Sequence, residues 1–423
     1  MSKPFLCLSL AAICAQLIAG CSSPQSKARH AGDWEEWPTV TTPANPVKPK
    51  LPPQQIDAEP VARQPLKALP HLSHAGETWV PLPRWAHDAG LQQPRKLSSA
   101  TFAPYSVRSA NGELVLRPGS QQARWDGMEL LLGFAPQLIN QQPFVHALDL
   151  DKTIQPLLTE PASLALGAHP VIVIDPGHGG ENAGTRSVLG SHYEKEFTLD
   201  WALRIQKLLQ ADGCKVFLTR ESDFDMALSN RVAVATEHRA DVFLSLHFNS
   251  AAPDEAEAGL ETYCLTPTGM PSNLTRNFSD ETDAIFPNNA FDAQNLKLAL
   301  RVHHALLEVN GHNDRGVRHA RFPGVLRGQE RPAILVEGGY LSNPREAGLI
   351  EDPAYRQKLA EAIAHALLDE RREATAAIHI GGAPMVQAAQ ANGAGLSGSN
   401  SLSQIDVSRS EQPQDTSHAA EIP

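Results

Sequence analysis

The sequence predicts an α/β fold: a mostly parallel sheet with helices on both faces, preceded by a small β-rich domain. Two observations lead to this fold class. Between residues 168 and 370, short apolar runs alternate with segments whose apolar residues recur at helical spacing, which is typical of parallel sheets. Between residues 76 and 160, Asn-Gly and Asp-Gly pairs separate short apolar runs, which indicates β-hairpins.

Length and charge limit the classes of function. The chain has 423 residues, enough for one to three domains, and 42% of them are apolar, enough for a sizeable core. Its formal net charge is −11, so it lacks the basic field that attracts nucleic-acid phosphates. We therefore expect no nucleic acid among its partners.

Residues 1–21 resemble a bacterial lipoprotein signal peptide. Lys3 precedes an apolar run, 5–17, that is too short to span a bilayer comfortably. The segment ends in Ile-Ala-Gly-Cys, which resembles a lipobox and implies a diacylglycerol on the thiol of Cys21. In the lipoprotein pattern, Ser22 favours sorting to the outer membrane, so we expect a periplasm-facing envelope protein with a lipid anchor in the membrane. An ordinary signal peptide with an incidental cysteine is the alternative.

Two further segments lack the apolar periodicity of folded structure. Residues 22–75 are rich in proline and predict an extended, disordered tether. Residues 371–423 turn to Ala, Gln, Ser and Gly and predict a disordered tail, with one candidate short strand at 376–380.

Two cysteines remain as thiols once the signal peptide is removed and Cys21 carries its lipid. Cys214 and Cys264 lie in separate predicted strands of an exported protein, where disulfides are allowed. Spacing alone does not decide whether they pair.

The segment 76–160 predicts a small β-rich domain without a catalytic cluster. It begins with a strand at 79–82 and a helical turn at 84–89, and it ends with a strand followed by a helix over 144–158. It loosely resembles the stalk-like N-terminal domains of bacterial envelope proteins. Its tryptophans are interpreted as core residues, with a sugar-binding platform as the alternative; they are Trp79, Trp85 and Trp125.

Strands and helices alternate between residues 168 and 370. The apolar run Val171–Ile174 predicts a first buried strand, and the spacing of Phe197, Trp201 and Ile205 predicts a helix over 194–209. Further strands are expected at 215–218, 241–246, 259–265 and 333–336, and 259–265 is expected at the edge of the sheet. Further helices are expected at 228–237, 295–309 and 355–368.

Polar side chains stand where three of these strands end. His178, His247 and Glu337 each follow an apolar run directly or through one tight turn, and Glu194 begins a helix. Carboxyl ends of parallel strands meet at one edge of a sheet, so these four residues are candidates for one site. Two imidazoles and a carboxylate with one open position form a catalytic zinc site, and the remaining carboxylate is a natural general base. A loop histidine at 178 and a favourable helix-terminal charge at 194 remain the alternatives.

Residues 171–368 closely resemble the zinc-dependent N-acetylmuramoyl-L-alanine amidases of the amidase-3 family. The matching motifs occur in family order and are specific when taken together. They are Ile174–Gly180, Tyr193–Glu196, Leu218–Arg220, Ser245–Asn249 and Leu335–Asn343. The resemblance implies the phosphorylase/hydrolase-like sheet of this family.

The resemblance also implies a metal site and a reaction. His178, Glu194 and His247 would bind one Zn²⁺, and Glu337 would be the general base and then the acid toward a zinc-bound water. The substrate would be peptidoglycan, cleaved between N-acetylmuramic acid and L-alanine of the stem peptide, in cell separation, remodelling or turnover. A zinc peptidase acting on stem or cross-link peptides, and a catalytically silent wall-binding protein, are the alternatives.

Further matched residues are expected to support this site. Arg220, Arg231 and Asn249 fit the family pattern as residues that orient the ligands or line the substrate groove. Asp175 is expected to orient its turn, and His192 is the strongest false candidate for a ligand.

The segment 267–289 is rich in Pro, Asn, Ser, Thr and Asp, and it predicts a long loop. Some cell-division relatives carry an inhibitory helix near this position, and no strong amphipathic helix is evident here. Whether the loop gates the groove, and whether the protein needs an activator, are left open by the sequence.

Overall fold

A computed structural model describes residues 71–381, apart from 75, 162–163, 165, 191, 276–278 and 311–312. The predicted signal peptide with Cys21, nearly all of the predicted tether and residues 382–423 lie outside the described residues. Within the described part, every helix is too short or too polar to cross a membrane.

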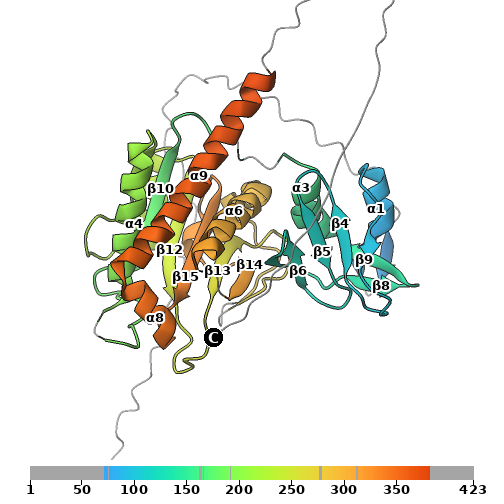
Figure 1. Cartoon of the computed structure of the whole chain (residues 1–423), viewed down its shortest axis with the longest axis horizontal. Coiled ribbons are helices and arrows are strands. Elements are labelled where there is room, and N and C mark those ends of the chain that lie inside the picture. Colours follow the sequence, from blue (N-terminus) through green and yellow to red (C-terminus); the bar gives the residue numbers. More distant parts are fainter. Residues whose placement is uncertain are drawn as a thin grey trace, which may run out of the picture. The chain divides into compact units, whose positions relative to one another are not determined.

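A sheet with the strand order β11-β10-β12-β15-β13-β14 forms the centre of the fold (Figure 1). Neighbouring strands are parallel from β11 to β15, β13 is antiparallel to β15, and β14 is parallel to β13. The predicted mostly parallel sheet is therefore confirmed. In chain order the strands are β10 (Val171–Pro176), β11 (Lys215–Leu218), β12 (Val242–Asn249), β13 (Leu260–Leu265), β14 (Asp314–Ala320) and β15 (Ala333–Tyr340).

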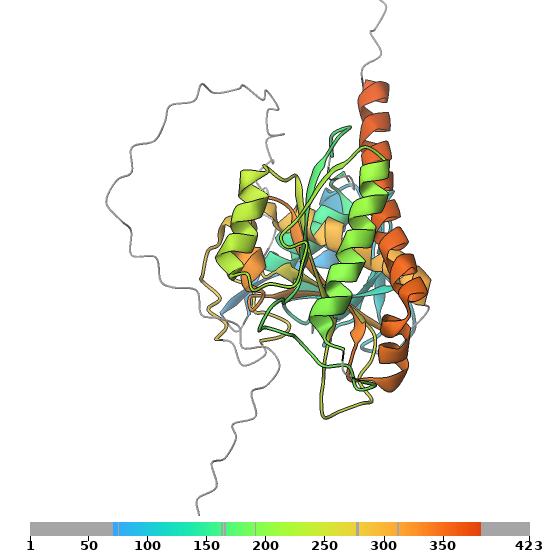
Figure 2. The same ribbon diagram turned by 90° about the vertical axis from the view of Figure 1, so that its left-hand side faces the viewer.

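Helices cover both faces of this sheet, as predicted. Figure 2 shows α5 (yellow-green) on one side and α4 (green) and α9 (orange-red) on the other. Successive residues of β10 enter opposite cores, with Ile172 and Ile174 on the α4 side and Val173 on the α5 side. Burial of both faces explains the unbroken apolar run. The helices are α4 (Glu194–Ala211), α5 (Leu228–Glu237), α6 (Asp292–Asn310), α7 (Gly324–Arg327), α8 (Pro344–Glu351) and α9 (Pro353–Gly381).

Two predictions about strands in this sheet need correction. β13 was predicted at the edge, but it lies between β15 and β14 and all its residues are buried. β14 was not predicted, because its sequence, Asp-Arg-Gly-Val-Arg-His-Ala, lacks an apolar run. The strand forms because it pairs with β13 along its length, so tertiary pairing overrides weak local propensity.

The chain between residues 72 and 158 is rich in strands, as predicted. The Asp126-Gly127 pair closes the β6–β7 hairpin with positive φ at both residues, 47° and 89°, as a tight two-residue turn requires. The elements are β1 (Leu72–His74), β2 (Glu77–Pro81), α1 (Leu82–Asp88), β3 (Arg95–Lys96), β4 (Tyr105–Arg108), β5 (Glu113–Leu116), β6 (Gln122–Trp125), β7 (Met128–Leu131), β8 (Gln137–Ile139), β9 (Gln142–His146), α2 (Ala147–Asp149), the π-helix η1 (Leu150–Ile154) and α3 (Gln155–Leu158).

The β-rich part continues the central sheet. β7 pairs with β14, so β3 to β7 extend one sheet of eleven strands. Asp314 at the start of β14 strengthens the junction: one carboxylate oxygen accepts a hydrogen bond from the Glu129 backbone nitrogen at 2.6 Å, and the other accepts one from His303 Nε2 at 2.9 Å. All three tryptophans, Trp79, Trp85 and Trp125, are buried, which supports the interpretation as core residues.

The last helix is longer than expected. We predicted a disordered tail from residue 371 and a short strand at 376–380, but α9 continues to Gly381. The segment Glu370–Ala377 is rich in Ala, Glu and Arg, which are strong helix formers, so the helix that begins at Pro353 has no local reason to stop at residue 370.

Candidate metal centre

His178 follows β10 through a tight turn and takes a left-handed backbone conformation, with φ of 63°. This conformation is unfavourable for a residue with a side chain, so the surroundings must hold it. The neighbouring loop supplies that support: Asp223 accepts the Gly180 backbone hydrogen bond at 2.7 Å, and Asp225 accepts that of Glu181 at 3.0 Å. Asn182 Oδ1 lies 2.8 Å from His178 Nδ1 and fixes the orientation of the ring.

A buried ion pair between Asp175 and Arg231 fixes the turn that leads from β10 to His178. Asp175, at the end of β10, is 1% exposed, and its carboxylate accepts from Arg231 Nη1 at 2.7 Å, Thr219 Oγ1 at 2.6 Å and Ser245 Oγ at 2.8 Å. Arg231 also donates to the carbonyl oxygen of His178 at 2.8 Å. Asp175 therefore orients its turn, as expected from the sequence.

Arg220 supports the same loop without touching the candidate ligands. Its guanidinium donates to the carbonyl oxygens of Pro176, Gly177 and Lys195 at 3.0, 2.8 and 2.8 Å. These carbonyls belong to the turn before His178 and to the first turn of α4. Arg220 thus joins the two segments that present His178 and Glu194.

Glu194 is the first residue of α4 and is buried beneath the loop after β10. Its Oε1 accepts a hydrogen bond from the Phe248 backbone nitrogen, and its Oε2 accepts one from that of Thr185, both at 3.0 Å. These bonds orient the carboxylate toward the end of β12, where His247 lies.

The structure brings His178, Glu194 and His247 together. Glu194 Oε1 lies 3.1 Å from His178 Nε2 and 3.0 Å from His247 Nδ1. One donor atom from each residue lies within 4.8 Å of the other two, and among the described residues this is the one such group of three His, Cys, Asp or Glu. Two imidazole nitrogens and a carboxylate oxygen are donors that zinc prefers, so the residues present fit this ion.

At Glu194 and His247, the electrostatic environment favours the protonation state that can bind a metal ion. Burial acts to raise the pKa of Glu194, but His178 and His247 outweigh it and hold that pKa far below its usual range. Burial lowers the pKa of His247 despite its hydrogen bond to Glu194. Burial also acts to lower the pKa of His178, but there the Glu194 carboxylate outweighs it and the pKa is raised. An anionic Glu194 and a neutral His247 are the forms that bind a cation.

Gly184 must be a glycine for this cluster to form. Its φ is 69°, and a Cβ at this position would lie 2.7 Å from both Glu194 Oε2 and His178 Cδ2. We expect Gly184→Ala to displace both side chains and to weaken zinc binding by about 10- to 100-fold, as with other changes around metal ligands. Competition with a chromophoric chelator measures this. Gly190→Ala is the matched control, because a Cβ there meets nothing within 4 Å, and equal affinities of the two variants would contradict the expectation.

Glu337 lies beside the cluster. It is paired in register with His247 across β12 and β15, and it is 4% exposed. The pKa of His178 is affected most by burial, then by Glu194 and Asn182. The Glu337 carboxylate makes a smaller contribution that raises this pKa. Glu337 therefore lies beside His247 in the sheet and within electrostatic reach of His178.

Asn249, the third of the residues expected to support the site, belongs to a network that the sequence did not reveal. Its Nδ2 donates to Glu261 Oε2 at 3.2 Å. Glu261, in β13 opposite Glu337, is 1% exposed and also accepts from Tyr340 Oη at 3.0 Å and Arg315 Nε at 2.5 Å. The signal in the sequence was a glutamate inside an otherwise apolar predicted strand.

Several histidines are excluded from the cluster. His192 is exposed and lies 2.8 Å from Glu196 Oε2, so it is a false candidate as expected. His303, on helix α6, is buried. His319 is buried in strand β14.

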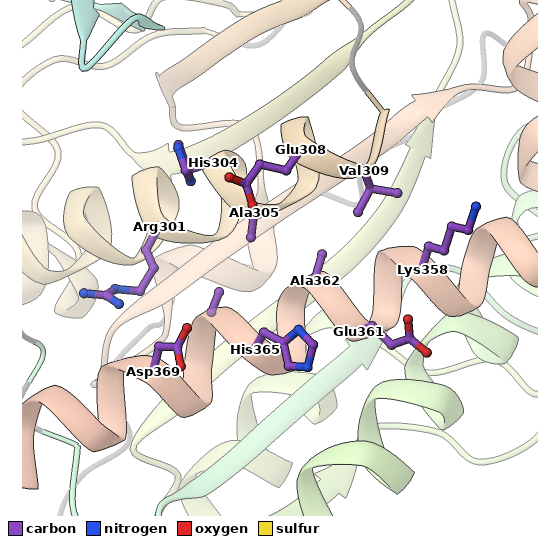
Figure 3. A pocket seen from close by; sticks show the side chains of 11 residues that line it. Arg301, His304, Ala305, Glu308, Val309, Lys358, Glu361, Ala362, His365 and Asp369 are labelled. Atoms are coloured by element: carbon purple, nitrogen blue, oxygen red, sulfur yellow. The ribbon is translucent and has the colours of Figure 1, made fainter. Parts of the chain in front are cut away.

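A groove of about 670 Å³ between α6 and α9 lies apart from the cluster (Figure 3). Charged and small side chains line it, among them Arg301, Glu361 and His365, and none of the predicted site residues is among them. The groove therefore does not form part of the candidate metal centre.

The chain is similar to known cell-wall amidases. The family model described as N-acetylmuramoyl-L-alanine amidase (Amidase_3) matches residues 172–369. N-acetylmuramoyl-L-alanine amidase AmiC of Neisseria meningitidis is 32% identical over 297 residues, which cover 65% of this chain and 68% of that protein. AmiC of Escherichia coli is 32% identical over 241 residues, which cover 51% of this chain and 56% of that protein. Among solved structures, AmiC2 of Nostoc punctiforme is 31% identical, with coverage of 49% of this chain and 99% of its own and a TM-score of 0.40.

Proposed function

The chain belongs to the amidase-3 family of N-acetylmuramoyl-L-alanine amidases, and we propose that it hydrolyses peptidoglycan between N-acetylmuramic acid and the L-alanine of the stem peptide. The observation that carries the proposal is the convergence of His178, Glu194 and His247 beside Glu337. The activity would serve cell-wall remodelling, including cell separation and turnover.

The three clustered residues would hold one Zn²⁺ through the ring nitrogens of His178 and His247 and a carboxylate oxygen of Glu194. When bound, zinc supplies a Lewis acid that polarises the amide carbonyl and lowers the pKa of water. The surrounding hydrogen bonds preorganise the donors: Phe248 and Thr185 orient Glu194, and Asn182 orients His178.

Glu337 moves the protons of the reaction. Its carboxylate takes a proton from the water that attacks the lactyl carbonyl carbon. It then gives this proton to the nitrogen of L-alanine as the carbon–nitrogen bond breaks. The products are a free lactyl carboxylate on the glycan and a stem peptide with a free α-amine.

The experiment that tests this function is digestion of purified peptidoglycan with the chain from residue 22 onward, with zinc and with chelator. We expect peptide-free glycan and intact peptides that begin with L-alanine, identified by mass spectrometry, only when zinc is present. Cuts within the stem or cross-link would replace this function with a zinc peptidase. An absence of products from a zinc-loaded protein would favour a silent wall-binding protein or one that requires an activator.

We also propose where the protein acts and how it is anchored there. Residues 1–21 would direct export, Cys21 would carry the lipid, and 22–75 would tether the folded part to the outer membrane, facing the periplasm. In this scheme, 76–160 form the β-rich domain and 168–370 the catalytic domain, joined by the β7–β14 pairing. Labelling cells with radioactive palmitate tests the anchor, since Cys21→Ser should lose the label; a labelled variant would contradict it.

A further inference from the structure

Beside Glu337, the sheet carries a second polar cluster that the reaction above does not use. We define the Glu261 cluster as Glu261, Arg315, Arg318, Tyr340 and Asn249. We propose that this cluster recognises a carboxylate of the stem peptide, with Arg318 as the residue that contacts it. This inference rests on the proposed function, because it names the part of that substrate which the site selects.

The strand register places Arg318 on the same face of the sheet as Glu337. Glu337 is opposite Glu261, and two residues along β13, Tyr263 is opposite Arg318. Residues opposite each other, and residues two apart in a strand, share a face. With strands about 4.8 Å apart and a rise of about 3.4 Å per residue, the Cα atoms of Glu337 and Arg318 are about 12 Å apart.

This separation matches the substrate. An extended peptide advances about 3.3–3.6 Å per residue, so groups two or three residues beyond the cleaved bond lie about 7–10 Å from it. The arginine side chain covers the remaining distance. The muramic sugar carries no charge once its lactyl group is in amide linkage, so the anionic groups near the cleaved bond are those of the peptide.

The hydrogen bonds within the cluster leave Arg318 as the guanidinium that can take a ligand. Arg315 pairs with both Glu261 and Glu257, so its charge is compensated inside the protein. Glu261 is saturated by the Tyr263 and Tyr340 hydroxyls, the Asn249 amide and Arg315. Arg318 Nη2 therefore stays 3.7 Å from Glu261 Oε1, close enough for attraction and too far for a hydrogen bond.

Arg318 is nevertheless held in place. Its Nε donates to the carbonyl oxygen of Arg315 at 2.9 Å, and its side chain is 18% exposed. Within the described part of the chain, the terminal nitrogens of Arg318 donate no hydrogen bond. A fixed guanidinium with unused donors matches a carboxylate, because it forms two parallel hydrogen bonds to one.

The charges around Arg318 favour an anionic ligand. The chain carries a net charge of −11, yet Arg315 and Arg318 lie on β14. This strand is next to β13, whose Glu261 is paired with Glu337. Burial acts to raise the pKa of Glu261, but the charge of Arg318 and then the hydrogen bonds from Tyr263 and Arg315 outweigh it and hold that pKa below its usual value. Glu261 therefore stays ionised and anchors both arginines without blocking Arg318.

The test compares three soluble disaccharide–tripeptides with the zinc-loaded chain from residue 22 onward. The first has free carboxylates on the second and third peptide residues, the second is amidated on the second residue, and the third is amidated on the third residue. We expect wild-type kcat/KM to fall by about 10- to 100-fold for one of the amidated substrates, the loss typical of a hydrogen bond to a charged group. The substrate that suffers the loss identifies the recognised carboxylate.

Arg318→Ala should lower kcat/KM for the free substrate to the amidated level, mainly through KM, and should remove the preference. Arg318→Lys should restore part of it, because a charge remains without the planar fork. Arg84→Ala, an exposed arginine in α1, is the control and should keep the wild-type preference.

The outcomes separate this inference from the function on which it rests. If wild-type protein cleaves all three substrates equally at the lactyl amide, the function stands and the carboxylate recognition is wrong. If it cleaves none at that amide, the function itself fails for the zinc-loaded chain acting without an activator, and the inference fails with it. The wild-type comparison needs no variant, so it decides the inference even where Arg318→Ala fails to fold.

Discussion

Glu337→Gln is expected to lower turnover of peptidoglycan by about 100- to 10,000-fold, the contribution typical of a general acid–base residue. The substitution keeps the size of the side chain and removes its ability to take and return a proton. Glu337 lies beside the three clustered residues but is not one of the candidate zinc ligands, so the variant should bind zinc with wild-type stoichiometry. Steady-state release of stem peptide, together with zinc content by atomic absorption, measures both effects.

A matched control comes from α9. Glu361→Gln changes the same atoms at the groove between α6 and α9, away from the metal centre, and should keep wild-type turnover. Turnover of Glu337→Gln within a few-fold of that control, at full zinc occupancy, would remove Glu337 from the proton transfers.

Asp175→Ala is expected to lower the free energy of unfolding by about 3–5 kcal/mol, because it leaves the buried Arg231 guanidinium without its partner. The hydroxyls of Thr219 and Ser245 lose the same acceptor. Urea unfolding followed by tryptophan fluorescence measures the difference. Asp88→Ala, which breaks an exposed pair with Arg84, should leave the unfolding free energy unchanged, and an equal loss in both variants would contradict the expected role of burial.

The pH dependence of this effect has a definite sign. Burial acts to raise the pKa of Asp175, but Arg231 and then Thr219 outweigh it, so the folded-state pKa lies below its ordinary value. A lowered carboxyl pKa means that ionisation favours the folded state. The stabilisation is fully present above about pH 4, the ordinary range of an aspartate, and is lost as pH falls through the lowered pKa. The difference between wild type and Asp175→Ala should therefore narrow below about pH 4.

Local pattern was sufficient to predict the strands of the central sheet other than β14, and the positions of the candidate ligands. The run Val171–Ile174 is apolar because both faces of β10 are buried, and His178 follows it after one tight turn. The helix over α4 was predicted from apolar spacing, and its first residue was identified as Glu194. These features depend on neighbours in sequence, so the sequence shows them directly.

Contacts between distant residues required the tertiary structure. Glu194 and His247 are 53 residues apart, and only the register of β10, β12 and the start of α4 brings their side chains to 3.0 Å. The family resemblance implied this convergence, but spacing alone left a loop histidine and a helix-terminal charge as alternatives.

The Glu261 cluster and the sheet junction were not predictable from local pattern. β14 lacks an apolar run, so its sequence does not predict a strand. That Arg318 and Glu337 share a face follows only from the pairing of β13 with both β14 and β15. The pairing of β7 with β14 likewise joins residues about 190 positions apart, through Val317 and Leu130. The sequence by itself determined which residues are candidates for the chemistry and which elements present them, because periodicity and turn residues act locally. The tertiary structure alone decided which side chains share a face, because strand register is set by pairing across the sheet.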